Sequence, residues 1–177
     1  MKKYFILISF LGLACSTNEK GEIQSNEQKV RDVETIIANY YAAMVKMYSG
    51  VPLDSDSLIN VYFDKDVYYV TYWGNTEPID STKSRLRRAL PKVREYQNRV
   101  ESMNVKIYND VALAFFILRQ QYVLDGQLMD EYLPTTYILE YKNGRWVVVH
   151  AHRSADLQTI QQLMQAAQRQ QASIKSR

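Results

Sequence analysis

The stretch from Asn143 to Ser154, NGRWVVVHAHRS, decides the fold. Asn143-Gly144 is the dipeptide most typical of a two-residue β-hairpin turn. The residues from Arg145 to Arg153 are rich in β-branched and aromatic side chains, which favour a strand. Successive side chains of a strand point to opposite faces. The expected faces are Val147, Val149, Ala151 and Arg153 on one side and Trp146, Val148, His150 and His152 on the other.

Three further strands are expected upstream of this hairpin. Residues 132–141, 111–124 and 99–108 have strand composition. They are separated by Asp125-Gly126 and Asn109-Asp110, which predict tight turns. Pro134 indicates a bulge or a sheet edge near the start of its strand, because proline cannot donate to a ladder. The second half of the chain therefore predicts an antiparallel meander of four strands.

The first half of the chain predicts helices. Ser25 with Gln28 is a capping-box pattern, and apolar residues recur at helical spacing from Val30 to Met47. Gly50 and Pro52 end this helix, and Asp54 or Ser55 can cap a short second one through Tyr62. Residues 66–73 predict a strand, and a third helix starts at Asp80 or Ser81 and ends by Pro91. Residues 155–177 predict a C-terminal helix and tail with a narrow apolar seam.

This order of elements predicts an α+β domain over residues 26–154. Helices gathered at one end of a chain, followed by a meander, pack on one face of the sheet. We expect a cone-shaped, strongly curved antiparallel sheet that is roofed by the N-terminal helices. Such a cone leaves a cavity for a small ligand.

Residues 1–15 have the pattern of a signal peptide. Lys2 and Lys3 precede an apolar run of about ten residues, which is too short to span a bilayer. The segment Leu11-Gly12-Leu13-Ala14-Cys15 resembles a bacterial lipobox, in which the cysteine is lipidated. This predicts a lipoprotein of the bacterial cell envelope, periplasmic or outer-membrane associated, with residues 16–25 as a flexible tether. The alternative is secretion after cleavage at Ala14.

Composition excludes several classes of protein. The net charge is +3, and without Lys2 and Lys3 the chain has 20 basic and 19 acidic residues, so nucleic acid is not an expected partner. Cys15 is the only cysteine, which rules out an internal disulfide or a cysteine-rich metal site. No phosphate loop, nucleophile elbow or dinucleotide fingerprint is present. We expect no cofactor.

Residues 144–154 closely resemble the final strand of the association domain of calcium/calmodulin-dependent protein kinase II. That domain belongs to the nuclear transport factor 2-like superfamily, which also includes the SnoaL-like polyketide cyclases and the ketosteroid isomerases. Arg119-Gln120-Gln121-Tyr122, followed by Asp125-Gly126, is similar to the association domain's earlier strand. The expected order of elements from Val30 to Ser154 also agrees with the superfamily.

The resemblance implies a ligand pocket and self-association. Arginines on these strands of the association domain line its pocket and can hold a small carboxylate. Arg119 and Arg153 match two of them, and Tyr137 falls at the place of a third. The family further implies homodimers, or larger homo-oligomers, that form through the outer face of the sheet.

The residues themselves leave two interpretations of this pocket open. Two arginines that converge in an apolar cone would require an anion, because unpaired buried charges are costly. Alternatively, internal salt bridges to acids such as Glu101 or Asp66 neutralise them. The aromatic candidates for the pocket wall are Tyr40, Tyr69, Trp73 and Phe115, and each of them could equally be a core residue.

Three functions are open for this domain. A non-catalytic site for a small carboxylate needs only Arg119, Arg153 and an apolar wall. An isomerase-like or cyclase-like acid–base enzyme would use Tyr40 as oxyanion donor, as the resemblance implies. The carboxylates of those enzymes fall at Thr71 or Tyr72 and near Thr135 or Thr136, where this chain has no acid, so we lean away from an enzyme. The third function is a purely structural oligomerisation module.

The pair His150 and His152 has two interpretations as well. Both imidazoles are expected on one face of the strand, as in a metal site, but the chain has only these two histidines. We therefore expect hydrogen-bonded histidines at a subunit contact and no bound metal.

Overall fold

The computed structural model describes residues 25–175, which form four helices and one six-stranded sheet. The helices are α1 (Asn26–Tyr48), α2 (Ser55–Tyr62), α3 (Ile79–Ala89) and α4 (Leu157–Lys175). The strands are β1 (Phe63–Val70), β2 (Thr76–Glu77), β3 (Val93–Tyr108), β4 (Val111–Leu124), β5 (Gln127–Lys142) and β6 (Arg145–Arg153). The predicted signal peptide, Cys15 and nearly all of the tether lie outside the described residues.

The sheet has the strand order β2-β1-β6-β5-β4-β3. The strands β3 to β6 pair as consecutive antiparallel hairpins, so the predicted meander is confirmed. Positive φ angles at Asp125, Gly126, Asn143 and Gly144 suit two-residue turns of the type that matches the twist of a hairpin. β1 pairs in parallel with β6 and, on its other side, antiparallel with the short β2. The sequence did not predict these two features.

The helix starts follow from capping residues. The Ser25 hydroxyl accepts a hydrogen bond from the Gln28 N–H at 3.2 Å, which confirms the predicted start of α1. The Asp54 carboxylate accepts one from the Ser57 N–H at 2.8 Å and caps α2. α3 begins at Ile79 after Pro78, earlier than predicted and without a side-chain cap.

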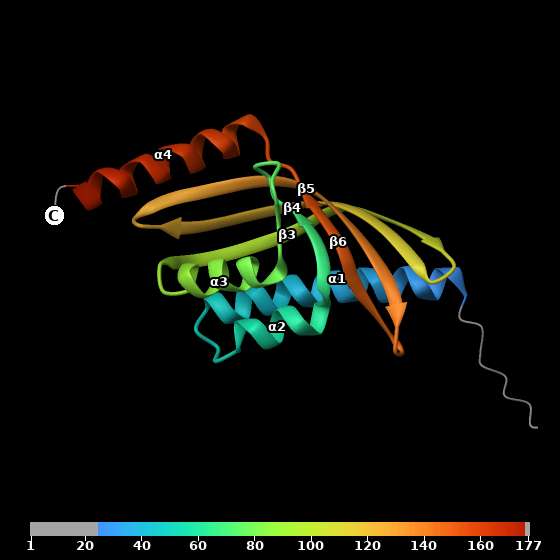
Figure 1. Ribbon diagram of the computed structural model, residues 1–177. Helices are drawn as coiled ribbons and strands as arrows, with labels where there is room; N and C mark the ends of the chain where they lie inside the picture. Colours follow the sequence, from blue (N-terminus) through green and yellow to red (C-terminus); the bar gives the residue numbers. More distant parts are fainter. Residues whose placement is uncertain (1–24, 176–177) are drawn as a thin grey trace, which may run out of the picture.

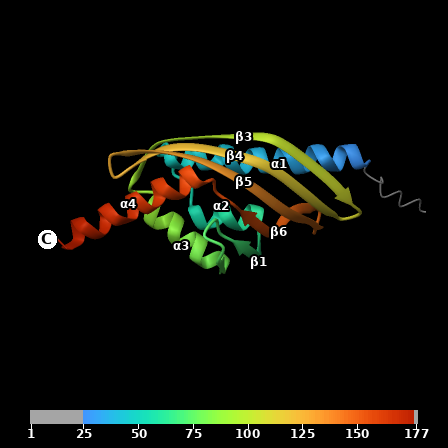
Figure 2. The same cartoon turned by 90° about the horizontal axis from the view of Figure 1, so that it is seen from above.

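Irregularities in β3 account for the curvature of the sheet. The pairing of β3 with β4 shifts between Arg94 and Gln97 and again between Glu101 and Asn104. Glu95 and Ser102 have positive φ angles at these two places. A bulge bends its strand and increases the local twist. In Figures 1 and 2 the sheet curves, α1, α2 and α3 lie together under one face of it, and α4 lies apart from them.

A bulge in β6 corrects the predicted division of its side chains between two faces. Ile138 pairs with His150 but Leu139 pairs with Val148, so Val149 is an extra residue. Because an extra residue shifts the alternation by one, the inner face contains Trp146 and Val148 before the bulge and Ala151 and Arg153 after it. The expected outward positions of His150 and His152 are unaffected.

The core lies between the inner face of the sheet and the three roofing helices. It is formed by buried apolar side chains that alternate along β4 and β5 and recur along α1. Among the most buried are Val33, Ile37, Phe116, Leu118, Leu133 and Leu139. This packing fixes which strand positions point inward and so defines the functional site.

α4 covers an open edge of β5. β6 ends opposite Thr135, so the first part of β5 has no strand on that side. The Tyr132 N–H donates to Thr159 Oγ1 at 3.0 Å and the Asp130 N–H donates to Gln162 Oε1 at 3.1 Å, both on α4. Side chains of α4 therefore replace the missing strand, and Pro134 sits at this edge as predicted. No helix in the range 25–175 has the length and hydropathy of a membrane span.

Candidate functional site

A cavity of about 210 Å³ opens between the inner face of the sheet and the helices α1, α2 and α3. Its wall is largely aromatic, and the polar groups among the lining residues include Arg153, Glu131 and Gln120. The tyrosines that line it are Tyr40, Tyr48, Tyr69, Tyr72, Tyr96, Tyr122 and Tyr137. An apolar wall with a few converging polar groups is the usual composition of a small-molecule site.

Arg153 brings a positive charge into this cavity. It is the last residue of β6, on the inner side of the sheet. Its Nη2 donates to the Tyr41 hydroxyl at 3.0 Å, and its buried Nε has no hydrogen-bond partner. Among residues 25–169 no carboxylate forms an ion pair with it. The two acids suggested by the sequence pair elsewhere, Glu101 with Arg99 and Asp66 with Lys65. The internal salt bridges that the sequence left open are therefore not formed.

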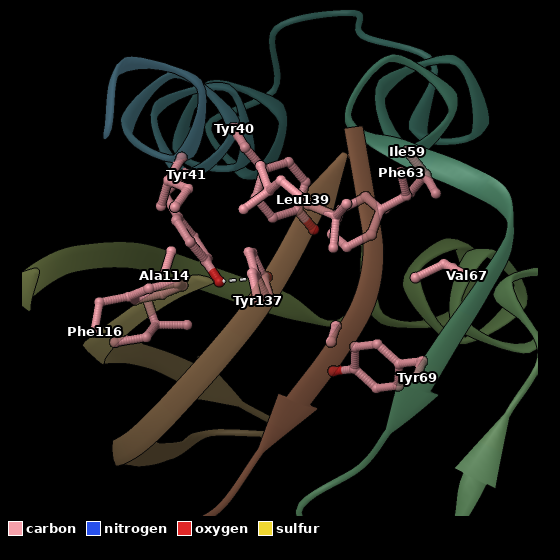
Figure 3. Packing of buried hydrophobic residues seen from close by; sticks show 14 of the residues in the cluster. Tyr40, Tyr41, Ile59, Phe63, Val67, Tyr69, Ala114, Phe116, Tyr137 and Leu139 are labelled. Atoms are coloured by element: carbon pink, nitrogen blue, oxygen red, sulfur yellow. Dashed lines mark hydrogen bonds between the residues drawn. The ribbon is translucent and has the colours of Figure 1, made fainter. Parts of the chain in front are cut away.

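A short chain of hydrogen bonds extends the charge of Arg153 to Tyr137. The hydroxyls of Tyr41 and Tyr137 are 2.8 Å apart, and both side chains are buried. The dashed line in Figure 3 marks their hydrogen bond. Either of these two hydroxyls can be the donor, because the Tyr41 oxygen has two lone pairs and can accept from both Arg153 and Tyr137. Tyr137 also lines the cavity.

The tyrosines around Arg153 are neutral hydrogen-bond donors. Burial raises the pKa of Tyr40, Tyr41 and Tyr137 well above the ordinary value, although the nearby Arg153 charge opposes this. Burial by itself would lower the pKa of Arg153, but the surrounding tyrosine oxygens outweigh it and raise that pKa. The Arg153 end of the cavity therefore presents a charged guanidinium and O–H groups, which favour an anion.

Glu131 places a carboxylate in the same cavity. It lies on β5 and is only 2% exposed. It accepts hydrogen bonds from Gln120 Nε2 and, at 2.6 Å, from the Tyr122 hydroxyl. Burial, followed by the Glu131 charge, raises the pKa of Tyr122, so this tyrosine keeps its proton and donates it. A carboxylate has about four lone-pair sites, so Glu131 can accept further hydrogen bonds.

A second chain of hydrogen bonds holds Glu131 in place. The Asn98 amide donates to the Tyr96 hydroxyl at 3.3 Å, and Tyr96 donates to Gln120 Oε1 at 3.0 Å. This contact orients the Gln120 amide so that its nitrogen donates to Glu131. Burial raises the pKa of Tyr96 to about 12, which keeps this donor protonated. This chain ends on an acceptor, whereas Arg153 presents a donor to the cavity.

Arg85 is the other cation on the cavity wall. It lies on α3, pairs with Glu77 and has its guanidinium carbon 6.0 Å from the centre of the Tyr69 ring. Since Glu77 neutralises it, Arg85 is a weaker anchor for an anion than Arg153.

Four of the six predicted ligand-binding residues line the cavity. Tyr40, Tyr69, Tyr137 and Arg153 are all among its wall residues. Trp73 is not, because β1 ends at Val70 and the indole, 52% exposed, lies in the following turn. Tyr72, and not the expected Trp73, lines this part of the wall.

The expectation that Arg119 meets Arg153 in the cavity is wrong. Leu118 is fully buried and Gln120 lines the cavity, so Arg119 between them points to the opposite face of β4. There its guanidinium lies 4.9 Å from the centre of the Tyr132 ring, in a cation–π contact. Phe115, also expected on the pocket wall, is 43% exposed on the same outer face.

Glu131 is the main residue of the site that the sequence analysis missed. The predicted strand began at Tyr132, which left Glu131 in a turn. A signal was present, since Met129, Glu131, Leu133, Thr135 and Tyr137 alternate strictly with outward residues. Counting back in steps of two from Tyr137, already expected in the pocket, leads to Glu131.

The structure also bears on the two histidines. The His150 ring stacks on Tyr68 of the neighbouring strand, with ring centres 5.6 Å apart. Within residues 25–175 no group of three or more His, Cys, Asp or Glu side chains is arranged to hold a metal ion.

Comparison with solved structures shows the same fold in proteins of low sequence identity. A nuclear transport factor 2-like protein from Cytophaga hutchinsonii is 11% identical with a TM-score of 0.57, covering 75% of this chain and 100% of its own. The hub of calcium/calmodulin-dependent kinase II from S. rosetta is 16% identical with a TM-score of 0.59, covering 71% and 95%. A candidate dehydratase of the nuclear transport factor 2-like family from Streptomyces avermitilis is 14% identical with a TM-score of 0.61, covering 75% and 99%.

Comparison with curated protein sequences gave no match. The profile of the SnoaL-like domain, however, matches residues 33–158, from α1 to the start of α4. This range contains every residue of the cavity wall named above. The chain belongs to the SnoaL-like domain family, within the nuclear transport factor 2-like fold.

Proposed function

We propose that this domain binds a small carboxylate in its cavity and that Arg153 is the anchor. The observation that carries the proposal is a guanidinium on the cavity wall with a buried, unpartnered Nε and no acid paired with it. A charge in such a place is costly unless an anion neutralises it. The planar guanidinium fits a carboxylate with two parallel hydrogen bonds.

The rest of the wall supports this assignment. Tyr137 offers a hydroxyl near the guanidinium, and Tyr69 and Phe63 provide an aromatic surface. The volume of about 210 Å³ corresponds to roughly seven waters at ~30 Å³ each. A carboxylate with a short carbon chain is of this size.

A thermal-shift screen of small carboxylates tests the proposal. A ligand that binds only the folded state raises the melting temperature with its concentration. We expect Arg153→Met to abolish the shift given by the best ligand. Arg119→Met is the matched control, because it removes the same type of side chain from the opposite face of the sheet and should leave the shift unchanged. A shift that persists in Arg153→Met would reject Arg153 as the anchor.

Acid–base catalysis is a second candidate function, and Glu131 is the observation that favours it. The cavity contains a buried carboxylate that could take a proton from a carbon acid. Neutral tyrosines such as Tyr137 and Tyr40 could donate to the oxyanion that forms. One of the structural neighbours is a candidate dehydratase.

Exchange of α-protons in deuterated water distinguishes the two functions. An enzyme of this kind should catalyse exchange in a small ketone, observed by proton NMR, and Glu131→Gln should abolish it. A protein that binds carboxylates without accelerating exchange is a binder only.

We further propose that the domain self-associates through the outer face of its sheet. Val111, Leu113 and Phe115 of β4 are exposed on this face at 37%, 36% and 43%. A row of apolar side chains exposed on a sheet face suits a symmetric contact between two copies. The structural neighbours include a hub domain of calcium/calmodulin-dependent kinase II.

We also propose that the domain is tethered to the bacterial cell envelope through a lipid on Cys15. The support is the sequence alone, namely the basic and apolar leader and the single cysteine at its end. Expression of the full chain in a bacterial host with a labelled fatty acid tests this. Label should enter the membrane fraction with the protein and disappear in Cys15→Ser. Cleavage after Ala14 without label would support simple secretion instead.

A further inference from the structure

Two opposite charges face the same cavity without pairing with each other. Among the side chains of residues 25–169, no acid forms an ion pair with Arg153, and no lysine, arginine or histidine forms one with Glu131. Glu131 is 2% exposed, so water neutralises its charge poorly. The proposed carboxylate accounts for Arg153 but leaves Glu131 unexplained.

We infer that the ligand is a zwitterion, with a carboxylate held at Arg153 and Tyr137 and an ammonium group held at Glu131. The inference rests on the proposed carboxylate site and extends it to the other end of the ligand. An ammonium has only donors, which match the free acceptor sites of Glu131. Charge-assisted hydrogen bonds of this kind are about twice as strong as neutral ones.

The hydrogen bonds around the cavity give it two distinct poles. At one pole, Arg153 has an unpartnered Nε–H to donate, beside the hydrogen-bonded hydroxyls of Tyr41 and Tyr137. At the other pole, donation runs from Tyr96 through Gln120 to Glu131, which ends with lone pairs to offer. A ligand with an acceptor at one end and a donor at the other satisfies both.

The strand register shows that the two groups of the ligand are several bonds apart. Glu131 and Thr135 both point inward, four residues apart on β5, which corresponds to about 13 Å along the strand. Arg153 is the partner of Thr135 on β6. The long side chains of Glu131 and Arg153 shorten this gap. They do not close it, as the absence of an ion pair between them shows. An α-amino acid, whose charges are adjacent, does not bridge such a gap, whereas an ω-amino acid does.

The alternative is that Glu131 has a purely structural role. Its bonds with Gln120 and Tyr122 link β5 to β4, and both strands are already paired along their whole length. Replacing a buried carboxylate by the amide of the same shape would then change stability but not the choice of ligand.

Calorimetric titration of the wild type with matched ligands separates these possibilities. Hexanoate and 6-aminohexanoate differ by the terminal ammonium, and leucine carries its ammonium next to the carboxylate. We expect 6-aminohexanoate to bind roughly tenfold or more tightly than hexanoate, as expected for a charged hydrogen bond. Leucine should gain no such advantage.

Variants assign the effect to its residue. In Glu131→Gln the two six-carbon ligands should bind within about twofold of each other, with hexanoate affinity retained. Glu140→Gln, on the same strand but facing outward, is the matched control and should keep the wild-type preference. Arg153→Met should lose both ligands.

Failure of this inference is distinguishable from failure of the proposed function. Equal binding of hexanoate and 6-aminohexanoate to the wild type would overturn the inference and leave the carboxylate site standing. A preference for the amine that survives Glu131→Gln would also overturn it. No binding of either ligand would overturn both proposals. The wild-type comparison needs no variant, so the outcome does not depend on Glu131→Gln folding.

Discussion

Arg153 shows how a residue can serve a site at the expense of stability. Its guanidinium is held among tyrosine rings with one hydrogen bond, to Tyr41, and with an unpartnered Nε. Residues kept in unfavourable surroundings are characteristic of functional sites. The internal salt bridge expected as an alternative would have removed this cost, and it is not formed.

We predict that Arg153→Met stabilises the protein in the absence of ligand. Methionine fills a similar volume without charge, and the hydrogen bond between the Tyr41 and Tyr137 hydroxyls remains. Replacing an unneutralised charge by an apolar side chain should gain about 1 kcal/mol, which raises the melting temperature by roughly 2–4 °C. Differential scanning calorimetry measures this. A fall of several degrees would mean that the guanidinium holds the fold together.

His150 makes stability depend on pH. Burial, and then the neighbouring His152, lowers the pKa of His150 in the folded protein. The unfolded chain therefore takes up this proton first as the pH falls. The contribution of neutral His150 to stability is present above about pH 6.5 and is lost as the pH falls through the lowered folded value.

We predict that His150→Gln reduces the loss of stability between pH 7 and pH 5. Urea denaturation at each pH gives the free energy of unfolding. His152→Gln should have a smaller effect of the same sign, because it removes only the secondary cause of the shift. Identical pH profiles for the wild type and His150→Gln would contradict this assignment.

At the scale of elements, α4 completes the sheet rather than standing apart from it. Thr159 is 1% exposed, accepts from the Tyr132 N–H and has its own N–H capped by Asp156 at 2.8 Å. These contacts explain how β5 extends beyond the end of β6 without an unpaired edge.

We predict that Thr159→Val costs about 1–3 kcal/mol of unfolding free energy, because it leaves a buried backbone donor unpaired without changing the side-chain volume. Hydrogen exchange should show faster exchange at the Tyr132 amide. Thr76→Val, at an exposed position of β2, is the control and should change stability by less than ~0.5 kcal/mol. An unchanged Tyr132 amide in Thr159→Val would show that α4 does not cover the edge.

The sequence predicted elements better than it predicted faces. Turn dipeptides and capping residues are local signals, so the turns of the meander and the bounds of α1 and α2 were predicted closely, whereas β3 and β5 begin earlier than predicted. The bulge at Val149 leaves no such signal, and it reversed the faces of Trp146 and Val148. The parallel pairing of β1 with β6 joins residues some 80 positions apart, which no local pattern encodes.

The difference between predicting elements and predicting faces also explains which cavity residues were predicted. Tyr40, Tyr69 and Arg153 were placed correctly because their elements were regular or the strand end was well defined. Arg119 was placed on the wrong face because the resemblance indicated its strand but not the face of the sheet to which its side chain points. Glu131 was missed because the predicted strand began at Tyr132, although β5 begins at Gln127, directly after the Asp125-Gly126 turn.

At the scale of the whole molecule, the sheet separates the two proposed functions. Its inner face and the three helices enclose the cavity, and its outer face presents apolar residues to solvent. A ligand and a second copy of the chain can therefore bind independently.

We predict that Phe115→Asp converts a self-associating protein into a monomer. A charge in the apolar row would be buried without a partner in a symmetric contact, at a cost of several kcal/mol. Light scattering coupled to size-exclusion chromatography measures the mass. Val61→Asp on α2, at a residue 52% exposed, should leave the mass unchanged. A wild-type mass of one chain at high concentration would contradict self-association through this face.

The proposed function depends most on a guanidinium inside the cavity that accepts an anion. The Nε–H resonance of Arg153 reports on this group directly. Nitrogen-15 NMR should show one slowly exchanging arginine Nε–H signal that is absent in Arg153→Met. Titration with hexanoate should shift this signal downfield and saturate, as its unpartnered donor gains an acceptor. An Arg153 signal that exchanges freely with water and does not respond to carboxylates would contradict the account.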